Sequence, residues 1–345
     1  MTALTASQAI LPAIHRTRQF LFNRFRWITF LKLAFVASVT EGISIRMRYT
    51  VSHAAHASTA TPTSMSDFLS HWLWLIGLIF VLVLPIAIFA LYLITRLRFA
   101  YFHCLTHNSS EIRPGWLLYA QQSMRLFEIS LAIWAVFAVV AGFTLYPLFN
   151  RYLTLSAQSG PNGLNDFPTA LTFAFSSFLN LSFLYVLIWA ADTVLHDFLL
   201  PHMAIENLSV AQAWNHFLTL ATSEPQAFVT YLSERFILPI IGAILSALVA
   251  VPMASMEAIV RSGSVMGALL AALVLMPLAI LAAVISIFVA LLLGGPLATW
   301  IRNYALLFYG SRYQALGELL TPAEPQPLQP PPPPAEASAS APPAF

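Results

Sequence analysis

The chain has 345 residues, of which 59% are hydrophobic and only 9% are charged. Soluble globular proteins contain about 45–50% apolar and about 25% charged residues, so this composition excludes an ordinary soluble domain. A net charge of +2 and a single cysteine exclude a nucleic-acid-binding surface, a disulfide framework and a cysteine-based metal centre. The apolar residues lie in long blocks, which is typical of membrane spans.

The N-terminal part of the chain is basic. Residues 1–26 contain no acidic side chain, and we expect this segment in the cytoplasm. The following stretch, Trp27–Ile43, is apolar but short, and it carries Lys32 and Glu41. We interpret it as a first membrane span, with an amphipathic helix lying in the membrane interface as the alternative.

Five further stretches have the length of about 20 apolar residues that a bilayer span requires. They are Trp72–Thr95, Phe127–Phe149, Ala170–Ala191, Phe236–Met256 and Gly267–Leu293. Together with Trp27–Ile43 they predict an all-α, polytopic membrane domain of about six transmembrane helices over residues 27–320. We expect Gly294, Gly295 and Pro296 to end the last span, and residues 321–345 to form a disordered, proline-rich tail.

The basic residues predict the orientation of these spans. With six spans and both ends inside, eleven arginines lie on the cytoplasmic side and four on the outer side. The cytoplasmic ones are Arg16, Arg18, Arg24, Arg26, Arg96, Arg98, Arg113, Arg125, Arg235, Arg302 and Arg312, and the outer ones are Arg46, Arg48, Arg151 and Arg261. Lysine and arginine in short loops prefer the cytoplasm. We therefore expect a multi-pass protein of the bacterial inner membrane with both termini in the cytoplasm.

Two cytoplasmic segments are similar to each other. In one, Ser209 and Gln212 form a capping box, and Trp214 and Phe217 follow on one helix face. In the other, the run from Asn108 to Glu111 provides a cap before an apolar face. Both predict amphipathic helices that lie in the plane of the membrane. The units Trp72–Phe149 and Ala170–Met256 would then form a parallel internal repeat; the alternative is that aromatic residues gather at any membrane interface.

Small residues recur every four positions on the last two spans. Because small side chains let transmembrane helices approach closely, we expect them to form a packing surface. The residues are Gly242, Ser246 and Ala250 on one span, and Ala282, Ser286 and Ala290 on the other.

Two groups of polar residues are candidates for a functional site. Asp192, His196 and Asp197 cluster at the inner end of the fourth span, where Asp192 and His196 share a helix face. We interpret them as a solvated helix end, with a proton-relaying carboxylate–imidazole pair as the alternative. His103 and His107 are spaced to share a metal ion, but such residues are more often satisfied polar groups at an interface.

The sequence contains no Walker loop, dinucleotide-binding fingerprint, H-E-x-x-H or G-x-S-x-G motif, and the longest stretch between spans is too short for a catalytic domain. We therefore expect no enzyme activity, no catalytic residue and no cofactor.

Two stretches carry a resemblance to a known group of proteins. They are Arg96–Trp134, "RLRFAYFHCLTHNSSEIRPGWLLYAQQSMRLFEISLAIW", and Asp197–Tyr231, which opens "DFLLPHMAIENLSVAQAW". The chain resembles an uncharacterised family of bacterial polytopic membrane proteins, similar to the membrane domain found ahead of some glycerophosphodiester phosphodiesterases. Because the phosphodiesterase domain is absent, the resemblance implies a helical inner-membrane bundle and no phosphodiesterase activity.

The functional hypothesis is a non-enzymatic envelope component that associates with lipids or proteins. The alternative is a transporter of small solutes or lipids built on the parallel repeat. As partners we expect membrane lipids, with envelope proteins or a second copy of the chain as further candidates, and no nucleic acid.

Overall fold

The computed structural model describes residues 3–23, 25–41, 65–159, 167–238, 240 and 265–320. Within these ranges every regular element is a helix, as predicted. The helices are α1 (Ala6–Phe22), α2 (Trp27–Glu41), α4 (Met65–Thr106), α5 (Ile112–Leu118), α6 (Ala120–Ser159), α7 (Phe167–Thr193), the π-helix η2 (Val194–Leu199), α8 (Leu200–Ile205), α9 (Val210–Ser223), α11 (Val265–Gly310) and α12 (Gln314–Leu320). Residues 225–238 are also helical.

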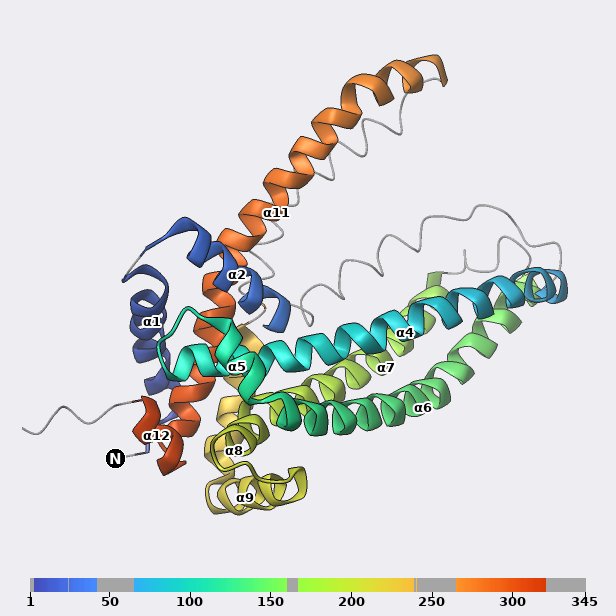
Figure 1. The fold of residues 1–345 in the computed structure, drawn as a ribbon. Coiled ribbons are helices and arrows are strands. Elements are labelled where there is room, and N and C mark those ends of the chain that lie inside the picture. Colours follow the sequence, from blue (N-terminus) through green and yellow to red (C-terminus); the bar gives the residue numbers. More distant parts are fainter. Residues whose placement is uncertain are drawn as a thin grey trace, which may run out of the picture.

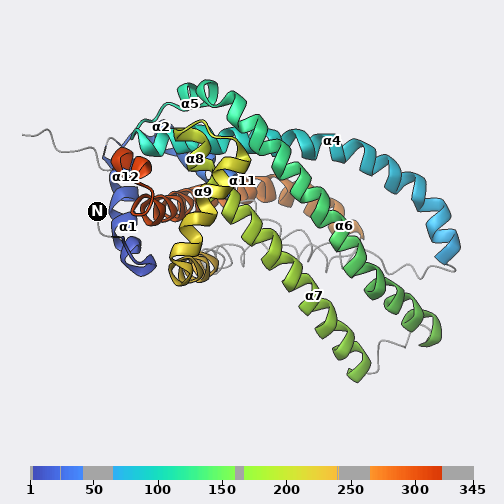
Figure 2. The same cartoon turned by 90° about the horizontal axis from the view of Figure 1, so that it is seen from below.

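The helices form two parts. The short helices pack with the inner ends of the long ones into a cluster that we call the hub, made of residues 3–41, 97–130, 192–238 and 295–320 (Figure 1). Helices α4, α6 and α7 leave the hub toward one side, where Figure 2 shows them from below, and α11 leaves it in another direction (Figure 1).

Aromatic side chains fill the centre of the hub. The ring of Phe198 is fully buried, and four other rings have their centroids 5.0 to 5.3 Å from it. These rings are Phe217 of α9, Phe228 and Tyr231 of the following helix, and Tyr309 of α11. Large aromatic side chains bury much apolar surface. This cluster therefore stabilises the packing of segments that are far apart in the sequence.

The long helices expose apolar side chains outside the hub. Phe143 of α6 is 79% exposed, and Ile86 of α4 and Phe178 of α7 are similarly exposed. Among the described residues, three segments are long and apolar enough to cross a membrane: Val81–Thr106, Ala120–Leu148 and Leu171–Ile205. Such surfaces are stable in lipid, where apolar side chains are not in contact with water.

These three segments overlap the second, third and fourth predicted spans. The predicted first span corresponds to α2, whose 15 residues extend about 22 Å, less than the roughly 30 Å of a bilayer core. Most of the predicted fifth span, Phe236–Met256, lies outside the described residues. The predicted sixth span lies within α11. A total of six spans therefore remains a prediction.

The basic N-terminal segment is a helix of the hub, which its composition did not predict. The side chain of Gln8 accepts a hydrogen bond from the backbone N–H of Thr5 at 3.1 Å and caps the start of α1. Ala6, Ala9 and Ala13 are buried, and α1 packs against α11. Small side chains at helical spacing allow the two helices to approach closely, so this face of α1 is determined by packing rather than by charge.

Helix α11 does not end at Gly294, Gly295 and Pro296 but continues to Gly310. The end of the last membrane span that we expected at these residues is therefore not a break in the helix. Gly295 instead provides a close contact between two helices. A Cβ atom added to Gly295 would overlap the Cβ of Ala34 in α2 and would lie 2.6 Å from its Cα. The backbone of α2 therefore crosses α11 at this glycine.

The structure has a helix in each of the two segments for which we predicted an amphipathic helix. Helix α9 begins with the expected capping box, in which Ser209 accepts from the N–H of Gln212. Helix α5 begins after Glu111 and ends at Leu118. Both follow an asparagine in the left-handed region, Asn108 with φ of 49° and Asn207 with φ of 53°. Asparagine tolerates this conformation better than most residues, and it reverses the chain after a helix.

We expect Gly295→Ala to destabilise the protein, because the added methyl group must push α2 away from α11. Overpacking of this kind costs about 1–3 kcal/mol. The thermal unfolding midpoint of the full chain in mild detergent measures the effect. The control is Gly142→Ala on α6, where no atom lies within 4 Å of the added carbon. Equal midpoints for the two variants would contradict the close crossing.

Candidate functional site

The residues singled out at the inner end of the fourth span lie on and just before the π-helix η2. Asp192 is in the last turn of α7, while His196 and Asp197 belong to η2 itself. His196 is 5% exposed and Asp197 is 1% exposed, so the interpretation of a solvated helix end is wrong for both. The rest of the hub, including segments from the C-terminal third of the chain, covers this helix. Single turns of π-helix occur frequently at functional sites.

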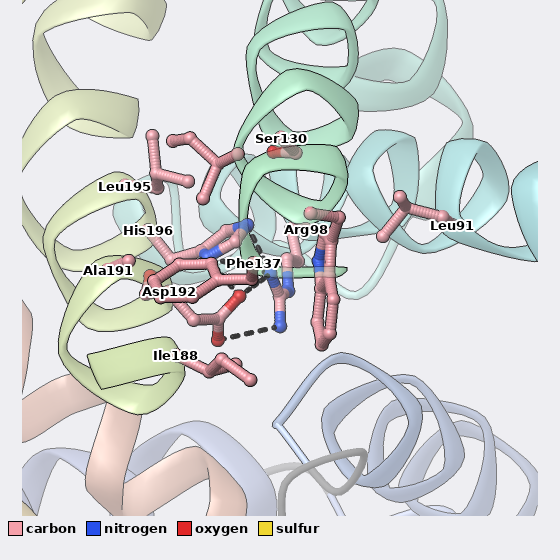
Figure 3. A pocket seen from close by; sticks show the side chains of 11 residues that line it. Leu91, Arg98, Ser130, Phe137, Ile188, Ala191, Asp192, Leu195 and His196 are labelled. Atoms are coloured by element: carbon pink, nitrogen blue, oxygen red, sulfur yellow. Dashed lines mark hydrogen bonds and ion pairs between the residues drawn. The ribbon is translucent and has the colours of Figure 1, made fainter. Parts of the chain in front are cut away.

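Asp192 and His196 contact each other and an arginine from α4. The carboxylate of Asp192 accepts hydrogen bonds from the guanidinium of Arg98 at 3.0 and 3.3 Å. The Nδ1 atom of His196 lies 3.0 Å from the same carboxylate and 2.7 Å from the Asp192 carbonyl oxygen. The guanidinium also contacts both ring nitrogens of His196 (Figure 3).

Asp192 and Arg98 offer opposite hydrogen-bonding groups to the imidazole. Asp192 presents only acceptors, its carboxylate and its carbonyl oxygen, whereas the guanidinium of Arg98 presents only donors. Arg98 in addition donates from Nε to the carbonyl oxygen of Thr40 in α2 at 3.0 Å. The group is thus an imidazole held between a carboxylate and a guanidinium.

A small cavity lies beside this group, where α4, α6 and α7 meet. Apart from the charged residues its walls are mostly apolar, with Leu91 of α4, Phe137 of α6 and Ile188 of α7 around it (Figure 3). The buried hydroxyl of Ser130, also on its wall, has no hydrogen-bond partner among the described residues. A volume of about 20 Å³ accommodates about one water molecule. The arrangement can hold a proton or one small polar molecule.

Asp197 forms a second, more deeply buried group. Its carboxylate accepts hydrogen bonds from Arg302 of α11 at 2.6 Å, from Arg235 at 3.1 Å and from the hydroxyl of Tyr231 at 2.7 Å. Arg235 also donates to Glu41 of α2 at 2.8 Å. An ion pair inside a protein is stable only if such hydrogen bonds compensate the loss of water.

The charge states in this second group follow from its geometry. Burial alone would lower the pKa of Arg235, but the neighbouring carboxylates of Asp197 and Glu41 outweigh burial and raise it. Burial, and then the Asp197 carboxylate, raise the pKa of the Tyr231 hydroxyl well above its ordinary value. Arg235 therefore stays charged and Tyr231 stays a neutral hydrogen-bond donor.

The arginine partners and Glu41 were missed as members of a site. The sequence identified Arg98, Arg235 and Arg302 only as cytoplasmic charges, and Glu41 only as an unfavourable charge in a short span. Each lies next to the end of an apolar stretch. Charged residues at several span ends are the signal that could have identified the group, because span ends on the same membrane side come close together.

The ring of His103, in the last turn of α4, stacks on the ring of His107, which follows that helix, with ring centroids 4.3 Å apart. Cys104 lies between them in the sequence, and its Sγ donates to the carbonyl oxygen of Glu111 at 3.3 Å. In the described ranges no group of three or more potential metal ligands gathers, at His103 and His107 or elsewhere.

The predicted packing residues cannot be placed. Gly242, Ser246 and Ala250 lie outside the described residues. Ala282, Ser286 and Ala290 lie within α11, where only their backbone is described.

We expect Asp197→Asn to destabilise the protein much more than Asp192→Asn does. Removing one charge from a buried ion pair costs about 3–5 kcal/mol, because the partner charge stays buried. The side chain of Asp192 is 32% exposed, so water can compensate Arg98 in part. Unfolding midpoints in detergent compare the two variants, with Glu318→Gln on the surface of α12 as the control. A midpoint for Asp197→Asn equal to that of the control would refute the compensating role of this carboxylate.

Comparison with known proteins identifies a family but no characterised relative. No curated protein matches the chain. No solved structure matches it either. The model of a family of unknown function, DUF7544, matches residues 4–319 and so covers the hub and the long helices. The chain therefore belongs to the family of unknown function DUF7544.

Proposed function

We propose that this protein is an integral, non-enzymatic component of the bacterial inner membrane that associates with lipids or other envelope proteins. The observation that carries the proposal is the separation of its surfaces. Large apolar side chains are exposed along α4, α6 and α7, whereas the ion pairs Arg98–Asp192, Arg235–Asp197 and Arg302–Asp197 lie in the hub. In a bilayer the apolar helices face lipid and the hub lies at its surface.

The hub is the cytoplasmic part in this proposal. Every described arginine that we expected in the cytoplasm lies in the hub or at its edge, where Arg96 is the outermost. Arg151, which we expected on the outer side of the membrane, lies in the part of α6 that is far from the hub (Figure 1). This distribution agrees with the preference of basic residues for the cytoplasm.

The parallel repeat forms the finer part of the proposal, with α2 lying in the membrane interface as part of the hub instead of crossing the bilayer as a first span. Two features common to the two units support the repeat. In each unit a left-handed asparagine, Asn108 or Asn207, ends one helix. In each, a ring before that asparagine contacts a ring after it: Phe99 with Tyr119, and Phe198 with Phe217.

The ion pairs favour a non-enzymatic role, because they satisfy one another. Asp192 is compensated by Arg98, and Asp197 by Arg235 and Arg302. Catalytic groups, in contrast, must be free to reach a substrate. The relation to the membrane domain found ahead of some glycerophosphodiester phosphodiesterases stays a prediction, and it agrees with a membrane role without phosphodiesterase activity.

Transport of a small solute or lipid is the second candidate. It is favoured by one observation, the cavity beside Arg98, Asp192 and His196 at the point where three apolar helices converge. Ionisable groups next to membrane helices are frequent elements of proton pathways.

Membrane fractions test the principal proposal. We expect the protein to stay in the membrane pellet after an alkaline carbonate wash, because its apolar helices remain in lipid. After extraction in mild detergent, mass spectrometry of co-purified lipids and proteins identifies what it associates with. Release into the carbonate supernatant, or a monodisperse protein in buffer without detergent, would overturn the proposal.

Proton flux separates the two candidates. We expect proteoliposomes with the wild-type chain to be no more permeable to protons than empty liposomes, as measured with a pH-sensitive dye inside them. A flux that is present in the wild type and lost in Asp192→Asn would favour transport. Arg113→Gln, which changes an exposed charge on α5, is the control.

A further inference from the structure

The corner between α1 and α2 carries exposed aromatic and aliphatic side chains. Phe22 is 48% exposed, Phe25 42%, Trp27 58% and Ile28 84%. The rings of Phe25 and Trp27 have their centroids 4.9 Å apart, and Phe22 stacks on Phe25 at 6.0 Å. We call these four residues the corner patch: Phe22, Phe25 and Trp27 contact one another in a row, and the exposed Ile28 follows Trp27 in α2.

The charged residues that neighbour the corner patch in the sequence are all basic. Arg18, Arg26 and Lys32 are exposed next to it in the sequence, and the first 40 residues contain no acidic side chain. Arg16, in contrast, points into the hub, where it donates to the carbonyl oxygens of Leu105 and Leu320 at 2.8 and 3.0 Å. The exposed basic groups thus remain available to a negatively charged partner.

Packing beneath the corner patch fixes its position. Phe30 and Leu33 are buried with Leu21 in a small apolar core, against which Leu292 of α11 packs. Leu292 lies where the predicted last span enters the hub, one turn before Gly295. The corner is therefore held beside the point at which α11 leaves the hub (Figure 1).

We propose that the corner patch and its three basic residues form an anchor for anionic lipid headgroups on the cytoplasmic face of the membrane. Trp27 and Ile28 insert among the lipids at the headgroup level, while Arg18, Arg26 and Lys32 contact the phosphate groups. Tryptophan prefers this interface, and basic residues beside an apolar patch bind anionic membranes. The proposal rests on the proposed membrane location and adds the class of lipid and the residues that contact it.

Charge complementarity favours lipid over a protein partner. Each basic residue near an anionic membrane surface raises local affinity about fivefold, and the three act together on a flat surface that is negative everywhere. No geometric match to individual acidic side chains is needed.

Depth-dependent quenching tests the anchor in the full-length protein. In a Cys104→Ala background, an environment-sensitive fluorophore is attached at Ile28→Cys, Phe143→Cys or Glu318→Cys. Each labelled protein is reconstituted in nanodiscs of phosphatidylcholine with spin-labelled lipid, with or without about 30% phosphatidylglycerol, the anionic component. We expect quenching at position 28 that increases with phosphatidylglycerol, quenching at position 143 in both mixtures, and none at position 318.

Charge variants then separate lipid binding from mere proximity. Combining Arg18→Gln, Arg26→Gln and Lys32→Gln should remove the increase caused by phosphatidylglycerol at position 28, while Arg113→Gln should leave it unchanged. A wild-type label at position 28 that behaves like the one at position 318 would overturn the anchor. So would a blue-shifted emission there without quenching, which indicates coverage by protein. Absence of quenching at position 143 would instead refute the proposed membrane location.

Discussion

Asp197 is the residue on which the hub depends most directly. Its carboxylate is almost inaccessible to water, yet it meets the charges of Arg235 and Arg302 and the hydroxyl of Tyr231. A charge that is removed from water without partners is unstable by several kcal/mol. The helix that carries Tyr231 and Arg235 and the inner end of α11 must therefore assemble around η2 together. Glu41 extends the same requirement to α2, because it neutralises the remaining charge of Arg235.

The π-helix explains how one short segment serves two groups. His196 and Asp197 are neighbours in the sequence, but His196 contacts Arg98 of α4 and Asp197 contacts Arg302 of α11. One side of η2 thus lies at the cavity between the apolar helices, and the other lies in the core of the hub. His196 is the neighbour of Asp197 in the sequence and Asp192 precedes Asp197 by five residues, so both groups of charges lie on one continuous stretch of helix.

The contrast between water and lipid as surroundings explains the rest of the architecture. The hub buries a conventional apolar core around Phe198, and basic residues such as Arg18, Arg26 and Arg113 are exposed on its outside. The long helices do the opposite and expose their apolar side chains, which is favourable only in lipid. The corner between α1 and α2 combines exposed aromatic rings with basic side chains, the composition that suits the boundary between lipid and water.

The sequence by itself determined the elements whose cause is local. Long apolar blocks predicted α4, α6 and α7, and the capping box at Ser209 and Gln212 predicted the start of α9, because both signals involve residues close together in the chain. Only the tertiary structure decided the features that depend on distant contacts. Gly295 became a helix crossing instead of a helix end because Ala34 packs on it, and the N-terminal segment became a helix of the hub because α11 covers its alanines. Asp192 and His196 were recognisable as a pair, since four residues separate them on one helix. Folding alone brought Arg98 next to Asp192 and His196, and it brought Arg235 and Arg302 next to Asp197. No local spacing relates these charges, because they lie at the ends of different helices.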